Sequence, residues 1–339
     1  MQEIKKRTYA MEKAFLSPYA CASENTRGRD RQEKPCEMRT EFQRDRDRII
    51  YCKAFMRLKN KTQVFFSPEG DHYITRLTHT LDVAQIARSI ARSLSLNEDL
   101  TEAIALGHDL GHTPFGHSGE RILDKLTEHG FKHNVQSVRV VDVLEKDGRG
   151  LNLTFEVKDG ILNHTRSGNA ATLEGRCVSL ADRIAYINHD LDDAVRAGLL
   201  TLDDVPKDII QVLGNTSKER IDTAISSIYR NSVNKNIVEM DVEVQKASEH
   251  MRSFMFDRVY YSKTAKSEED KAERMLTEMF NYFLKNTGEL PQSYINLIDK
   301  YGEEQTVIDY LSSMTDRYAV YMFSKIYVPR GWSFVDESN

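Results

Sequence analysis

Apolar residues recur at spacings of three and four along most of the chain, which is the pattern of amphipathic helices. In the stretch 74–96, Val83, Ile86 and Ile90 mark one apolar stripe, and His79 lies four residues before Val83 on it. His79 is therefore predicted to point inward. Alternating runs of β-branched and aromatic residues, which would indicate strands, are nearly absent, and only residues 64–66 look extended enough for a short hairpin. The pattern predicts an all-α fold.

Polar breaks and capping residues divide this pattern into separate helices. Asn97 is a predicted N-cap, and Thr113 and Pro114 are predicted to cap and to open a further helix. We expect helices at 39–58, 74–96, 97–110, from 114, at 134–145, 155–163 and 177–197, and a mostly helical scaffold from 201 to 326.

The length of 339 residues favours one large core with a smaller lobe. We divide the chain into a basic N-terminal arm (1–36), a core (37–200) and a C-terminal helical region packed on it (201–339). Segment 17–36 is polar, broken and rich in arginine, so we expect an arm that orders on a partner or a neighbouring subunit. Four scattered cysteines without a CxxC pair argue against a zinc cluster or a disulfide framework.

Composition and charge restrict the function classes. The chain is 40% hydrophobic and 29% charged, as soluble globular proteins are. It has no apolar run near the roughly 20 residues that span a membrane, and no signal-peptide stretch, so we expect a cytoplasmic protein without membrane contact. Residues 1–61 carry a net charge of +7 and the remainder −12. The basic segment would either grip phosphates or form a solvated helix face, and the acidic remainder disfavours single-stranded nucleic acid as a partner.

Candidate chemistry gathers in a histidine-rich window. Five of the ten histidines lie between residues 108 and 133, and an acid follows the first of them in the string GHDLGHTPFGHSGE. A lone histidine on an apolar face is usually a core residue, but an adjacent His-Asp pair with further histidines and an inward His79 favours metal binding. Imidazole plus carboxylate suits Mg, Mn, Fe, Co, Ni or Zn and leaves coordination positions open.

A further carboxylate has to come from elsewhere in the chain, and Asp182 is the best candidate. It is predicted to open a helix on which Asp182, Tyr186 and Asp190 follow at i, i+4 and i+8 and share one face. The alternative, an acidic face in solvent, fits Asp182 poorly because it lies within an otherwise apolar run.

His117 and Glu120 form a second candidate pair. They lie three residues apart on one face of the predicted helix, and a carboxylate beside an imidazole is the usual arrangement for a general acid or base. A position near a helix start also suits a phosphate oxygen. A simple surface contact between the two side chains is the alternative.

These residues resemble the HD superfamily, whose signature is a spaced His, a His-Asp doublet and a later Asp. More closely, residues 25–200 resemble the bacterial dGTP triphosphohydrolase-like proteins. The blocks that carry this resemblance are RLKNKTQVFFSPEGDHYITRLTHTLDVAQIAR, LTEAIALGHDLGHTPFGHSGE, FKHNVQSVRV, GILNHT, LADRIAYINHDLDDAVRAG and, at 314–319, MTDRYA.

The resemblance implies roles for individual residues. It implies metal ligands at His79, His108, Asp109 and Asp182. It implies catalytic residues beside the scissile α-phosphate at His117, Glu120 behind it, and His112, with His133 lining the same pocket. Arg76 would contact the substrate phosphates, Tyr186 would stack on the deoxyribose, Asp190 would bond its 3′-hydroxyl, and Gln63 would lie near sugar and base. Arg183 falls where a relative has a phosphate-binding lysine, although close bacterial relatives often have glutamate there.

The resemblance also implies an all-α HD-domain fold, a divalent metal cofactor, a dNTP substrate, a dNTP effector and a homo-oligomer such as a hexamer. The expected reaction converts a dNTP to deoxynucleoside and inorganic triphosphate. Two alternatives stay open here: another HD phosphohydrolase, such as a phosphodiesterase or nucleoside monophosphate phosphatase, and a non-catalytic protein that binds nucleotides or single-stranded nucleic acid.

Overall fold

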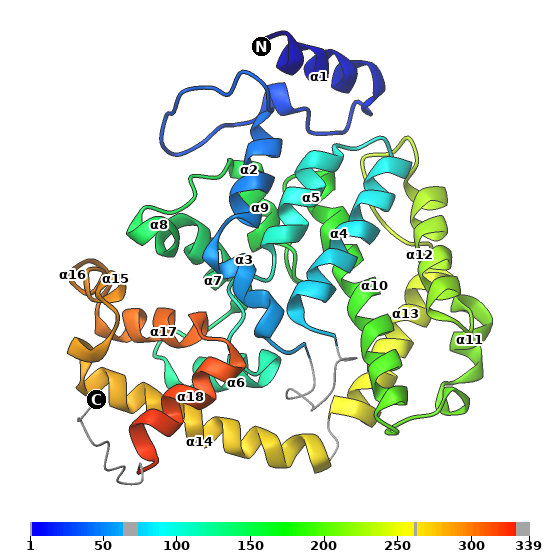
Figure 1. Cartoon of the computed structure of the whole chain (residues 1–339). Coiled ribbons are helices and arrows are strands. Elements are labelled where there is room, and N and C mark those ends of the chain that lie inside the picture. Colours follow the sequence, from blue (N-terminus) through cyan, green and yellow to red (C-terminus); the bar gives the residue numbers. More distant parts are fainter. Residues whose placement is uncertain (1, 64–73, 261–262, 330–339) are drawn as a thin grey trace, which may run out of the picture.

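The computed structural model describes residues 2–63, 74–260 and 263–329, and within these ranges the protein is all-α, as predicted (Figure 1). Its extended pairings there are two isolated bridges, Arg29 with Thr154 and Thr62 with Thr75. The hairpin expected near residues 64–66 lies outside the described residues. No helix in the described part of the chain is both long and apolar enough to cross a membrane.

Helix α4 (Arg76–Ser93) lies at the centre of the molecule and packs most extensively against α5 (Glu98–Gly107) and α10 (Leu173–Arg196). Helices α2 (Glu41–Ile50) and α9 (Phe155–Leu162) cover α5. The predicted cap is confirmed at Asn97, whose side chain accepts hydrogen bonds from the backbone N–H groups of Asp99 and Leu100. The predicted apolar stripe of α4 is buried, and this burial fixes the orientation of the helix and of His79, which lies one turn before the stripe.

The remaining helices surround this centre. Before residue 150 they are α1 (Gln2–Phe15), α3 (Lys53–Arg57), α6 (Gly116–Leu126), α7 (His133–Arg139) and α8 (Glu145–Gly148). After residue 200 they are α11 (Lys207–Leu213), α12 (Ser217–Ser232), α13 (Val242–Met255), α14 (Lys263–Lys285), α15 (Gln292–Ile295), α16 (Ile298–Tyr301), α17 (Glu303–Ser313) and α18 (Asp316–Tyr327). Short 3₁₀ turns at Ser23–Asn25, Leu58–Asn60, Leu202–Asp204 and Thr287–Glu289 and π turns at Val140–Leu144 and Phe256–Tyr260 complete the chain.

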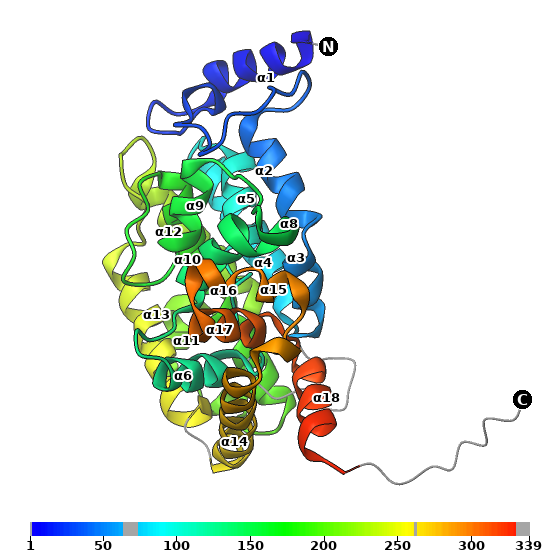
Figure 2. The same ribbon diagram turned by 90° about the vertical axis from the view of Figure 1, so that its left-hand side faces the viewer.

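Buried apolar side chains form two clusters. The first runs from Phe42 to Val259 and includes α2, α4, α5, α9, α10, α12 and α13. The second combines α6 with α14, α17 and α18, and Figures 1 and 2 both show α6 lying beside α14. Helix α6 therefore packs with the C-terminal helices, although it follows the central helices in sequence. The domain boundaries at residues 36 and 200 stay a prediction.

Two predicted helix starts are wrong. Helix α10 begins at Leu173, capped by Thr172, so Asp182 lies in its middle and does not open it. Helix α6 begins at Gly116, after Phe115, which has a φ of 64°. Thr113 does not cap the helix, because its hydroxyl donates to the Gly116 carbonyl. The helix expected at 39–58 is also divided, since α2 ends at Ile50 and α3 begins at Lys53.

The N-terminal arm forms hydrogen bonds and an ion pair with its own chain, and the expectation that it orders on a partner or a neighbouring subunit stays a prediction. The Cys21 N–H donates to the Glu174 carboxylate at 2.9 Å, Thr26 donates to Glu156 at 2.7 Å, and Arg29 pairs with Asp45. All three carboxylates are buried, on α10, α9 and α2 respectively. Buried charges require partners, and the arm supplies them.

Candidate active site

The four predicted metal ligands come together from three central helices. His79 lies on α4, His108 and Asp109 directly follow α5, and Asp182 lies on α10. His79 Nε2 is 3.1 Å from Asp182 Oδ1, and His108 Nε2 is 3.4 Å from Asp109 Oδ2 and 3.9 Å from Asp182 Oδ1. Ligand atoms of His79, His108 and Asp109 all lie within 4.8 Å of one another. This set, which we call the ligand cluster, is buried except for Asp182, whose side chain is 22% exposed.

The hydrogen bonds of the ligand cluster leave lone pairs directed at its centre. His108 Nδ1 lies 2.6 Å from the Ala105 carbonyl and donates to it, so in the neutral imidazole, the form that binds a cation, Nε2 carries the lone pair. That Nε2 atom is buried without a hydrogen-bond partner. Burial alone would raise the pKa of Asp182, but the hydrogen bond with His79 outweighs burial and holds the pKa below its usual range. An orphaned imidazole nitrogen between two ionised carboxylates fits a divalent cation.

Arg76 connects the ligand cluster to Gln63. It is buried at the start of α4, and its Nη1 donates to Asp109 Oδ2 at 2.7 Å while Nη2 donates to the Gln63 carbonyl at 3.4 Å. The Nε of Arg76 and the side-chain oxygen of Gln63 are buried without hydrogen-bond partners. Two residues predicted to contact substrate thus have unused polar atoms beside the cluster.

A second group of side chains, His112, His117, Glu120 and His133, adjoins the first and is here called the second cluster. The His112 ring stacks on His133 at 4.1 Å, and its Nε2 is 3.2 Å from Asp109 Oδ1. Glu120 bonds His133 closely, with Nδ1 at 2.9 Å from both of its oxygens. His117 is less tightly held, at 3.5 Å from Glu120 and with a 59% exposed side chain. Glu120 therefore supports His133 more closely than His117.

The ionisation of Glu120 follows from these contacts. Burial raises its pKa, but hydrogen bonds with His117 and His133 outweigh burial and hold the pKa well below its usual range. The carboxylate is therefore ionised and can orient both imidazoles.

His164 is a neighbour of both clusters that the sequence analysis did not single out. Its Nε2 lies 3.2 Å from His133 Nε2, its Nδ1 lies 2.7 Å from the Ile161 carbonyl, and its ring centroid is 5.0 Å from that of His108. Burial lowers the pKa of His164 to about 4. It stands in the GILNHT block, but no spacing to the other histidines pointed to it.

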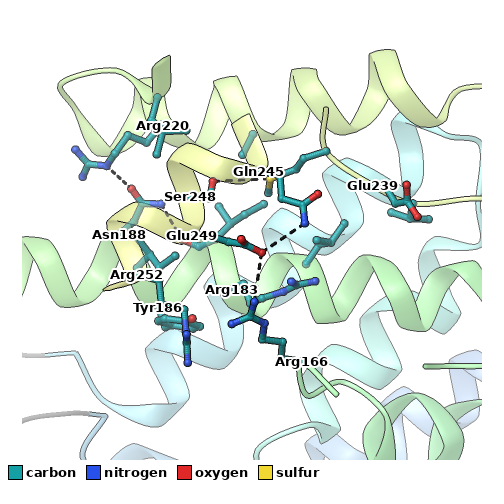
Figure 3. A pocket seen from close by; sticks show the side chains of 17 residues that line it. Arg166, Arg183, Tyr186, Asn188, Arg220, Glu239, Gln245, Ser248, Glu249 and Arg252 are labelled. Carbon is teal, nitrogen blue, oxygen red and sulfur yellow. Dashed lines mark hydrogen bonds and ion pairs between the residues drawn. The ribbon is translucent and has the colours of Figure 1, made fainter. Parts of the chain in front are cut away.

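Tyr186 and Arg183 line a cavity of about 300 Å³ between α10, α12 and α13 (Figure 3). None of the four predicted ligands lines this cavity, but Tyr186 lies one turn beyond Asp182 on α10 and so connects the two. Asp190 is buried one further turn along, and burial raises its pKa well above the usual range.

Residues outside the predicted site complete the cavity. Arg252 of α13 lines the cavity with Tyr186, and Arg166 donates to Glu249 at 3.3 Å, as Figure 3 shows. Helices α12 and α13, which belong to the part of the chain expected to be scaffold, thus supply walls of this cavity. Their basic side chains have no local sequence signal, since they meet α10 only in the folded chain.

Comparison with known proteins identifies the family. Residues 76–187 match the HD domain and residues 238–325 the phosphohydrolase-associated domain. Proteins named deoxyguanosinetriphosphate triphosphohydrolase-like, from Caldanaerobacter subterraneus and Clostridium tetani, are 55% and 49% identical, covering 97% and 96% of this chain and 97% of each relative. A solved phosphohydrolase from Bacteroides thetaiotaomicron shares the fold, with a TM-score of 0.53, 16% identity, and coverage of 82% of this chain and 67% of that one. The protein is thus an HD-domain phosphohydrolase that belongs to the family of deoxyguanosinetriphosphate triphosphohydrolase-like proteins.

Proposed function

We propose that the protein hydrolyses a dNTP to deoxynucleoside and inorganic triphosphate with the help of a divalent cation. The observation that carries this proposal is the convergence of two imidazoles and two carboxylates, 3.1 to 3.9 Å apart, beside the Tyr186–Asp190 face of α10. The names of the relatives support the choice of substrate.

The residues that would hold the cation are His79, His108, Asp109 and Asp182, a ligand set that suits Mg, Mn, Fe, Co, Ni or Zn. When bound, the cation supplies Lewis-acid stabilisation of negative charge on a phosphoryl oxygen.

Basic side chains on both sides of α10 would bind the triphosphate. This group carries about four negative charges near neutral pH and is expensive to bury without partners. Arg76 lies beside the ligand cluster with a buried Nε that has no hydrogen-bond partner, and Arg183 and Arg252 flank Tyr186. Guanidinium groups suit phosphate oxygens because they donate in pairs.

His117 is the proposed proton donor to the leaving 5′-oxygen. It lies in the first turn of α6, where the backbone N–H groups favour an anion, and its exposed ring is accessible to substrate. Glu120 orients it, and His112 and His133 lie within 6.4 Å of it between ring centroids. Such a residue typically contributes about 10²- to 10⁴-fold to the rate.

Tyr186 and Asp190 are proposed to hold the deoxyribose. The Tyr186 ring would cover the sugar and leave little room for a 2′-hydroxyl. Asp190 would bond the 3′-hydroxyl, since a carboxyl group with a raised pKa can donate as well as accept.

Product analysis tests the proposal. Purified protein is incubated with each dNTP, alone and in mixtures, with Mg²⁺ and with Mn²⁺, and the products are separated by chromatography. We expect inorganic triphosphate and deoxynucleoside, with mixtures revealing any effector nucleotide. Monophosphate or orthophosphate would indicate another HD phosphohydrolase, and no product would indicate a binding protein. Light scattering of the same sample tests the proposed homo-oligomer.

A further inference from the structure

Asp316 connects the C-terminal helices to two loops of the candidate active site. It is the first residue of α18, within the MTDRYA block, and it is buried. Its carboxylate accepts hydrogen bonds from the Phe115 N–H at 3.0 Å, the Thr62 N–H at 3.0 Å and the Thr62 hydroxyl at 2.6 Å. One side chain thus holds two segments that are about 200 and 250 residues away in sequence.

The turn that Asp316 holds is a strained entry into α6. Phe115 has a φ of 64°, in the left-handed region that side chains other than glycine rarely adopt. Gly116 follows with a φ of 56°, and a Cβ there would lie 2.8 Å from the Gln63 carbonyl oxygen. The backbone at 115–116 therefore packs directly on the segment at 62–63, with no room for a side chain. Such a conformation persists only where neighbouring groups fix it.

Lys61 fixes the same loop from its other end. It is buried, and its ammonium group donates to the carbonyls of His112 and, at 2.8 Å, Ser312. Hydrogen bonds of Lys61 at one end and of Asp316 at the other therefore connect residues 112 to 116 to the corner between α17 and α18. Helix α6 starts at the end of this loop and carries His117 and Glu120.

We propose that Asp316 is a positioning residue, which sets His117 and Glu120 against the ligand cluster by fixing the Phe115 turn. This inference rests on the proposed function for its catalytic consequence. It assigns the phosphohydrolase-associated region an indirect part in catalysis, through the position of α6. Asp316 is not needed to start α18, because the Thr315 hydroxyl already accepts the capping hydrogen bond from the Tyr318 N–H at 3.2 Å.

The variant Asp316→Asn tests this role, and Thr315→Ala is its matched control. Asparagine keeps the size of the side chain but has one oxygen acceptor in place of two, so it cannot accept from both the Phe115 N–H and the Thr62 donors, and the Phe115 turn is no longer tied to the Thr62 segment. Thr315→Ala weakens the start of the same helix and leaves the Asp316 contacts intact. Both full-length variants are compared with the wild type in kcat, KM, metal content, melting temperature and hydrogen exchange.

We expect Asp316→Asn to lower kcat by about ten- to a hundredfold, because a small misplacement of catalytic groups has effects of this size. KM and metal content should stay at wild-type values, and exchange should rise in the peptide covering 112–120 but not in that covering 100–108. Thr315→Ala should lower the melting temperature and leave kcat unchanged.

Wild-type kcat and wild-type exchange at 112–120 in Asp316→Asn would overturn the inference, as would an equal loss of kcat in Thr315→Ala. If the wild type releases no triphosphate, the proposed function fails, and the exchange measurement alone then decides whether Asp316 holds the turn.

Discussion

The ligand cluster and the second cluster are neighbours that the fold holds in different ways. The ligand cluster comes from α4, α5 and α10, which pack on one another in the first hydrophobic cluster. The second cluster depends on α6 and α7, and α6 packs in the other hydrophobic cluster with α14, α17 and α18. His79 and His108 are buried, whereas His117 is largely exposed.

This difference would keep the proposed cation binding separate from the proposed proton transfer. A cation site benefits from rigid, preorganised ligands, and the packed central helices provide them. A proton donor has to meet a substrate that enters and leaves, and an exposed side chain on a separately packed helix allows this. Substitutions in the ligand cluster should therefore remove the metal, and substitutions in the second cluster should leave the metal bound.

The largest effect is expected for Asp182→Asn, which replaces an ionised ligand by a neutral amide. Metal content after dialysis and triphosphate release should both fall below detection. Asp182 is preferable to Asp109 for this test, because removing Asp109 would leave the buried Arg76 unpaired. Asp222→Asn, at an exposed position of α12, is the control and should keep both properties. Retained metal in Asp182→Asn would contradict the ligand assignment.

His117→Ala should come next, with turnover lowered about a hundredfold or more and metal content unchanged. The reason is loss of the proposed proton donor without any change in the ligand cluster. His129→Ala is the control, since His129 lies in the same window of sequence and is exposed. Steady-state kinetics and metal analysis on the same samples provide the measurement. Equal turnover in the two variants would remove His117 from the chemistry.

The sequence predicted the ligand cluster better than the second cluster, and the reason is physical. The His108-Asp109 doublet, the stripe that turns His79 inward and the Asn97 cap are local signals, and local helix geometry is enough to interpret them. The start of α6, in contrast, is not determined by local sequence. It depends on Phe115 in a left-handed conformation, which Asp316 holds from the other end of the chain.

Residue spacing also failed to predict which histidine forms the shorter hydrogen bonds with Glu120. Helical spacing pairs Glu120 with His117, but the tertiary fold brings α7 close enough for His133 to take the shorter bonds. Residue spacing pointed to neither His164, although it stands in the GILNHT block, nor Arg252, because each meets the site only through packing of distant helices. The composition of the arm at 17–36 suggested little structure of its own, yet its polar groups donate hydrogen bonds to buried carboxylates such as Glu174.

Tyr186→Ala should have an intermediate effect, raising KM for dNTP about tenfold. An aromatic contact of roughly 1 kcal/mol or slightly more corresponds to this factor. The variant should also accept ribonucleoside triphosphates more readily, since the ring would no longer block a 2′-hydroxyl. Tyr186→Phe is the control because it keeps the ring and loses only the hydroxyl. Competition between dNTP and rNTP measures the change, and unaltered selectivity in Tyr186→Ala would place the sugar elsewhere.

Glu120→Gln is expected to act on stability, lowering the free energy of unfolding by about 2 kcal/mol at pH 7, because it weakens charge-assisted bonds to His133. The folded-state pKa of Glu120 lies below its usual value of 4.5, so its contribution is present above that value and disappears as the pH falls toward the folded-state pKa. Urea unfolding at pH 7 and at successively lower pH values should show the wild type and the variant converging. The exposed Glu128→Gln should match the wild type throughout. A difference that did not change with pH would mean that Glu120 stabilises the second cluster by shape and not by charge.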